Sequence, residues 1–115
     1  MSRGRALLLA IALLGTAAAR ADTECSVSAE EWSRPRSAAM VLALPGVREC
    51  VRYWNADPHQ RLVLIHAPGE EASLWATELR DWLVALGVPS AQLDLRAVGT
   101  DAERVLLRVE APLAP

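Results

Sequence analysis

Residues 61–98 read RLVLIHAPGEEASLWATELRDWLVALGVPSAQLDLRAV. The segment opens with a short apolar run, 61–66, that predicts a central strand buried on both faces. An amphipathic helix is expected over 70–86, ended by the glycine and the proline that follow it. Alternation of apolar and polar residues at 93–97 predicts a second strand. This order favours two parallel strands joined by a right-handed crossover.

The expected helix carries apolar residues at helical spacing. They should form one stripe that packs against the sheet. Its members are Trp75, Leu79, Trp82 and Leu86.

The flanking segments supply the remaining elements. Alternation predicts a strand at 25–31 and a final strand at 105–110. Ser37 can cap a short helix that ends at Leu44. Pro45-Gly46 is expected to interrupt this helix, and an amphipathic helix should follow at 47–55. The last two strands of the chain, joined by a short turn, should be antiparallel.

Together these elements predict an α/β fold with the order β-α-α-β-α-β-β. The expected architecture is a two-layer sandwich, a mixed sheet of about four strands with helices on one face.

The N-terminus has the pattern of a secretory signal peptide. A short basic start precedes the apolar run Ala6 to Leu14, and the small-x-small sequence Ala19-Arg20-Ala21 follows. We expect cleavage after Ala21, which leaves one domain over 22–111 and a frayed tail over 112–115. The apolar run is too short for a stable membrane anchor. A periplasmic or secreted protein is therefore expected.

The net charge of the chain restricts the classes of partner that it could bind. Cleavage would remove three of the twelve basic residues and none of the fourteen acidic ones, so the exported chain has a net charge of −5. An acidic domain with no basic stripe argues against nucleic acid as a partner. It also argues against docking on an anionic membrane.

Cys25 and Cys50 are the two cysteines of the chain. An even number of cysteines in an exported protein favours a disulfide. A redox pair or a zinc site fits less well, because there is no CxxC pair and no Cys/His spacing typical of zinc.

The segment from about Trp54 to Gly99 resembles the OmpA-like C-terminal domain, a peptidoglycan-associating module of bacterial envelopes. His66 ends its strand as the family histidine does, and Gly87-Val88-Pro89 falls at the family's helix stop. Asp81-Trp82-Leu83 falls where the family has an aromatic–Leu pair. The stretch from Pro68 to Gly87 also resembles small exported bacterial proteins that are uncharacterised.

The family's two ligand-binding charges do not carry over. The family aspartate falls on Pro68 and the family arginine on Trp75, while Ala76 keeps the neighbouring alanine. In the family these charges bracket a zwitterionic diaminopimelate head group, which proline and tryptophan cannot grip. The resemblance therefore implies a shared fold with the ligand site lost, and peptidoglycan binding is not expected.

One cluster could hold a metal or perform acid/base chemistry, namely His59, His66, Glu70 and Glu71. Its spacing matches no metal motif, and two carboxylates at a helix start are ordinary dipole partners. We therefore expect no metal, no cofactor and no catalysis. A rebuilt peptidoglycan or glycan site near His66 and Glu70 is the alternative, and an enzyme using these two residues is the third.

Two of the four tryptophans suggest a protein partner. Trp32 and Trp54, if exposed beside Arg34, Arg36 and Arg52, would suit an interface. The sequence therefore favours a non-catalytic interaction or accessory domain, whose partner would be another envelope protein.

Overall fold

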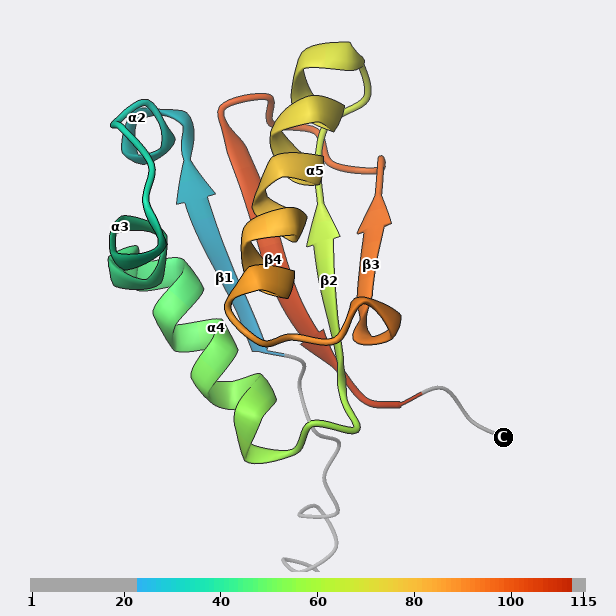
Figure 1. The fold of residues 1–115 in the computed structure, drawn as a ribbon. Coiled ribbons are helices and arrows are strands. Elements are labelled where there is room, and N and C mark those ends of the chain that lie inside the picture. The colour runs from blue at the N-terminus through green and yellow to red at the C-terminus, as the bar shows by residue number, and fades with distance from the viewer. Residues whose placement is uncertain (1–22, 113–115) are drawn as a thin grey trace, which may run out of the picture.

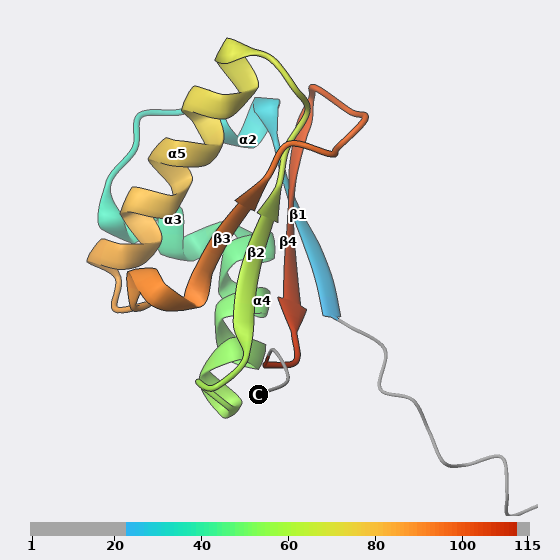
Figure 2. The same cartoon turned by 90° about the vertical axis from the view of Figure 1, so that its right-hand side faces the viewer.

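The computed structural model describes residues 23–112 and contains one four-stranded sheet with strand order β1-β4-β2-β3. Figure 1 shows the helices in front of this sheet, and the turned view in Figure 2 shows them gathered on one side of it. The expected two-layer α/β sandwich is confirmed. The strands are β1 (Thr23–Ser28), β2 (Arg61–Ile65), β3 (Leu93–Arg96) and β4 (Arg104–Glu110). The helices are α2 (Ala29–Trp32), α3 (Ala38–Ala43), α4 (Pro45–Ala56), α5 (Glu70–Ala85) and the short 3-10 turn η2 (Ser90–Gln92).

Strand β2 is central, and its neighbours run in opposite directions. It pairs in parallel with β3, to which helix α5 connects it, as the sequence predicted. On its other side it pairs antiparallel with β4. The last two strands are antiparallel to each other but do not form a hairpin, because β2 lies between them. The segment between β3 and β4 crosses the end of β2, where Gly99 donates a backbone hydrogen bond to His66.

The first strand is shorter than predicted. Strand β1 ends at Ser28, which begins helix α2 instead of continuing the alternation to Glu31. The Ser28 hydroxyl accepts a hydrogen bond from the Glu31 backbone N–H at 3.1 Å, and the Glu31 carboxylate accepts one from the Ser28 N–H at 2.9 Å. This capping box starts a helix where periodicity alone indicated a strand.

Helices α3 and α4 follow one another almost without a linker. Ser37 caps α3 as predicted, accepting from the Met40 N–H at 3.1 Å. The expected break between the two helices is present, but the second helix begins two residues earlier than predicted. Pro45 occupies the first turn of α4, where a missing N–H costs nothing. Gly46 then lets α4 approach β1, because a Cβ there would lie 2.1 Å from the Ser26 carbonyl oxygen.

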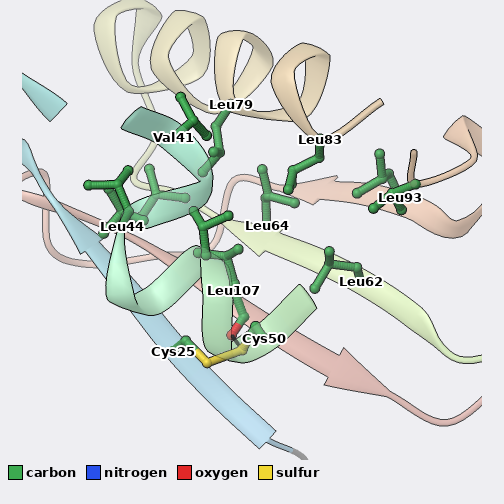
Figure 3. Packing of buried hydrophobic residues seen from close by; sticks show 14 of the residues in the cluster. Cys25, Val41, Leu44, Cys50, Leu62, Leu64, Leu79, Leu83, Leu93 and Leu107 are labelled. Carbon is green, nitrogen blue, oxygen red and sulfur yellow. Dashed lines mark hydrogen bonds between the residues drawn. A yellow bond between two sulfur atoms is a disulfide. The ribbon is translucent and has the colours of Figure 1, made fainter. Parts of the chain in front are cut away.

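The core lies between the sheet and the helices (Figure 3). Helix α5 contributes Ala76, Leu79 and Leu83 as its fully buried residues. The predicted stripe is therefore correct at Leu79 but rotated, since Trp75 and Trp82 are only partly buried at its edges. The smaller alanine and leucine side chains let the helix lie closer to the sheet than two tryptophans would.

The predicted disulfide is present. Cys25 of β1 and Cys50 of α4 are bonded, with their Cα atoms 6.1 Å apart (Figure 3). The bond fixes an edge strand to the helix that covers it.

The expected signal peptide, residues 1–21, lies outside the described residues, as does most of the expected tail, so both stay predictions. Between residues 23 and 112 the helices are too short or too polar to cross a membrane.

Candidate functional site

His66 lies at the carboxyl end of β2, and its surroundings hold it in place. The residue is 5 % exposed. Its ring Nδ1 lies 2.8 Å from the carbonyl oxygen of Ala67, and because a carbonyl only accepts, Nδ1 carries the hydrogen. The His66 backbone donates to the Arg96 carbonyl at 2.9 Å and accepts from the Gly99 N–H at 2.8 Å. His66 is therefore a buried residue that hydrogen bonds hold at the end of the sheet.

Glu70 and Glu71 form the first turn of α5 and are exposed. Gly69, with a φ of 112°, turns the chain into this helix, a conformation that favours glycine. Both carboxylates lie where the partial positive charge of the helix N-terminus stabilises them. They and Glu103 line a surface hollow of about 420 Å³, together with Trp75. The other lining residues are Ala29, Pro68, Gly69, Ala72 and Ala102.

The cluster expected from the sequence is not brought together. His59 lies in the turn before β2, at the opposite end of that strand from His66. Five strand residues span roughly 16 Å, which is too far for a shared ligand. His66 is not among the residues that line the hollow of Glu70 and Glu71. Within residues 23–112, no group of three or more His, Cys, Asp or Glu side chains could hold a metal ion.

The tryptophans expected to face a partner are buried. Trp32 is 8 % exposed and Trp54 is 6 % exposed, so the expectation of exposed aromatics at these positions is wrong. Trp32 packs on Trp75 with ring centroids 6.3 Å apart and planes 28° from parallel. The Trp54 indole donates to the Gln60 carbonyl at 3.0 Å. Each ring fills space between a helix and its neighbours, as large aromatics at helical spacing usually do.

Trp75 also links two hollows. A second hollow of about 340 Å³ shares Ala29, Glu71 and Trp75 with the first and continues along α5 past Leu74. We call the two together the α2/α5 groove. The buried Nε1 of Trp75 has no hydrogen-bond partner within the described chain. The family resemblance aligned Trp75 with a ligand-binding arginine of that family, whereas the contributions of α2 and of Glu103 follow only from the tertiary structure.

Charged side chains cover the sheet face that carries no helix. Arg96 contacts Glu110 with both terminal nitrogens, at 3.0 and 3.1 Å, and Arg108 contacts Glu24 at 2.8 Å. Salt bridges from Arg61 and Arg96 to Asp94, and from Arg108 to Glu110, extend this network across all four strands. Alternation in the strands predicted polar residues here, but the pairing of these partners depends on the register.

The network raises the pKa of two of its arginines. The hydrogen bond to Glu110 raises the pKa of Arg96, and that to Glu24 raises the pKa of Arg108; partial burial opposes both shifts. A pKa raised by folding stabilises the fold below the unfolded pKa, and that contribution is lost only as the pH rises past the folded pKa. Both guanidinium groups therefore stay charged at physiological pH.

No protein-family model matches this chain, and no curated protein matches it.

Proposed function

We propose that this chain is an exported, non-catalytic interaction or accessory domain of the bacterial envelope. It is a degenerate relative of the OmpA-like module in which the ligand site has been lost. The signal-peptide pattern at 1–21 supports export. The Cys25–Cys50 disulfide is compatible with an oxidising compartment. His66 directly follows β2 and Gly87 follows α5, an order that is compatible with the resemblance.

The observation that carries this proposal is the lining of the hollow at the start of α5. Pro68 and Trp75, which replace the family's two charges, both line it. Every ionisable residue that lines it is a glutamate: Glu70, Glu71 and Glu103. A zwitterionic ligand would therefore lose its partner for the carboxylate and meet like charge instead. Two charge-assisted hydrogen bonds contribute about 3–6 kcal/mol, so their loss lowers affinity by about two to four powers of ten.

The surroundings of the nearby histidine support a non-catalytic role. A general base needs a basic atom within hydrogen-bond reach of substrate. His66 is buried, its Nδ1 is engaged by Ala67, and it does not line the hollow beside Glu70. Acid/base chemistry by His66 and Glu70 together is therefore disfavoured.

The α2/α5 groove supports a second candidate, the binding of peptidoglycan or another glycan at a rebuilt site. Trp75 offers a partly exposed ring, and Glu70 and Glu71 offer hydrogen-bond acceptors beside it. Because His66 is buried, such a site would consist of Glu70 and Trp75 without the histidine.

Two measurements test the proposal. N-terminal sequencing of protein recovered from the periplasm should begin at Asp22, and a retained Met1 would contradict export by cleavage. Co-sedimentation with purified sacculi should show no saturable binding, with an intact OmpA-like domain as the positive control.

The same assay separates the two candidates. Saturable co-sedimentation that soluble stem peptide competes for would contradict loss of the ligand site. If Glu70→Ala weakened that binding and Glu49→Ala did not, the rebuilt site would be the better explanation. Glu49 is the matched control because it is an exposed glutamate on α4, outside the groove.

A further inference from the structure

A second groove lies between α4 and the end of α5, which pack on the same face of the sheet (Figure 1). Its volume is about 390 Å³, within the range of pockets that bind ligands and peptide side chains. We call it the α4/α5 groove. Its lining residues are Arg48, Val51, Arg52, Trp54, Asn55, Leu86, Gly87 and Val88.

The rim of this groove carries two arginines that form no salt bridge within the described residues. Of the nine arginines between residues 23 and 112, five contact a carboxylate within 4.0 Å, but neither Arg48 nor Arg52 does. Both are exposed on α4 and lie four residues apart. Like charges at this spacing destabilise a helix. Neither guanidinium group is neutralised by a salt bridge within residues 23–112.

The floor of the groove is apolar. Trp54 and Val88 form its buried part, while Val51 and Leu86 are half-buried. Beside the rim, the Arg52 guanidinium lies 5.9 Å from the ring centroid of Tyr53, which is 46 % exposed.

This composition is typical of protein interfaces. Tyrosine, tryptophan and arginine are enriched in binding hot spots. Here apolar residues form the floor of the groove, and exposed arginine and tyrosine side chains lie beside it.

We propose that the α4/α5 groove binds a segment of a partner protein that carries acidic side chains next to apolar ones. The argument is charge complementarity. The exported chain has a net charge of −5, yet the ionisable residues that line this groove are both arginines. Carboxylates of the partner would pair with Arg48 and Arg52, and its apolar side chains would cover Val51 and Leu86.

The number of arginines favours a peptide over an anionic membrane. Sequence-readable binding to anionic lipid uses clusters of about four to eight basic residues on one surface. Two guanidinium groups on an otherwise acidic domain fall short of that. This inference rests on the proposed role as an interaction domain and names the chemistry of its partner.

The test uses protein purified after export and synthetic, fluorescein-labelled peptides. One set places two glutamates around leucine or phenylalanine, and the matched set replaces each glutamate with lysine. Fluorescence polarisation should show saturable binding of glutamate peptides at or below about 1 mM, the range of weak but specific affinity. The lysine peptides should bind at least about tenfold more weakly.

Charge-reversed variants locate the binding. Arg48→Glu with Arg52→Glu should weaken binding at least about tenfold, because both carboxylate contacts become repulsive. Arg34→Glu with Arg80→Glu is the matched control, since these arginines also form no salt bridge with the part of the chain that the structure describes but lie outside the groove. It makes the same change in net charge and should alter binding less than about twofold. Thermal melts of both variants establish that each is folded.

Three results would overturn the proposal. They are equal binding of glutamate and lysine peptides, unchanged binding after reversal of Arg48 and Arg52, and absence of binding by every glutamate peptide. Sedimentation with phosphatidylglycerol vesicles that depends on Arg48 and Arg52 would also reject it, in favour of a membrane surface. None of these results bears on sacculus binding, so the failure of this inference is distinguishable from failure of the proposed function.

Discussion

The backbone N–H of Gly99 donates a hydrogen bond of 2.8 Å to the carbonyl oxygen of His66, which ties the segment after β3 to the end of β2. A Cβ at Gly99 would lie 2.9 Å from the carbonyl carbon of His66. The approach is closer than a side chain permits, so glycine is required here for space.

Substitution at this position should therefore be costly. Gly99→Ala forces two backbone segments apart, and we expect a loss of about 1–3 kcal/mol in the free energy of unfolding. Urea denaturation of the two proteins measures it. Val98→Ala is the matched control, because Val98 is 69 % exposed and its truncation should cost less than about 0.5 kcal/mol. Equal effects would show that the close approach is relaxed in solution.

The Cys25–Cys50 disulfide should supply a large part of the stability. It closes a loop of 25 residues, and the loop-entropy relation gives about 3–4 kcal/mol for that length. Thiol titration of the unfolded, unreduced protein should find no free thiol. Reduction should lower the melting temperature by more than about 10 °C.

A double variant isolates this effect. Reductant should leave the melting temperature of Cys25→Ser with Cys50→Ser unchanged. Two titratable thiols in protein recovered from the periplasm would contradict the disulfide.

Helix α5 offers a test of its buried face. Leu79 is fully buried, so Leu79→Ala should cost about 2–5 kcal/mol in the free energy of unfolding. Arg80→Ala, the neighbouring substitution outside the core, should cost less than about 0.5 kcal/mol. Chemical denaturation compares the two. A similar loss from both would mean that the orientation of α5 is wrong.

On the sheet face that carries no helix, Glu110 should contribute measurably to the free energy of unfolding through its ion pairs. This carboxylate accepts from Arg96 with both oxygens and lies 3.6 Å from Arg108. Glu110→Gln should cost about 1 kcal/mol. Asp101→Asn should cost less than about 0.5 kcal/mol, because Asp101 and Arg104 are both more than half exposed.

The pH dependence of the stability lost in Glu110→Gln follows from the charge of Arg96. The pKa of Arg96 is raised by its hydrogen bond to Glu110, so Arg96 stays charged at neutral and mildly alkaline pH. The cost of Glu110→Gln should therefore stay constant between pH 7 and about pH 9. Denaturation curves at both pH values measure it. A cost that disappears by pH 9 would contradict this assignment.

Local patterns in the sequence were sufficient to predict most of the helices and strands. The apolar run at 61–66 and the capped helix after it predicted β2 and α5, and Gly87 adopts the expected left-handed turn with a φ of 113°. The pairing of Cys25 with Cys50 also followed from the sequence, because the chain contains only these two cysteines.

The candidate sites could be predicted only in part. Glu70 lines a groove, as its place at a helix start allowed, whereas His66 is buried and does not line that groove. Trp32 and Trp54 were expected at the surface, but periodicity in a short helix does not say which neighbour will cover a ring.

Strand neighbours were decided by tertiary structure. Period-two alternation in 104–110 identifies a strand and its buried face, but it is the same whichever strand lies alongside. Inserting β4 between β1 and β2 places Leu107 opposite Cys25 on one side and Leu64 on the other. The sequence therefore determined most of the regular segments and the buried faces of the strands, because those depend on local spacing. Only the folded chain determined the strand order, the salt bridges and the two grooves, because these depend on contacts between residues distant in sequence.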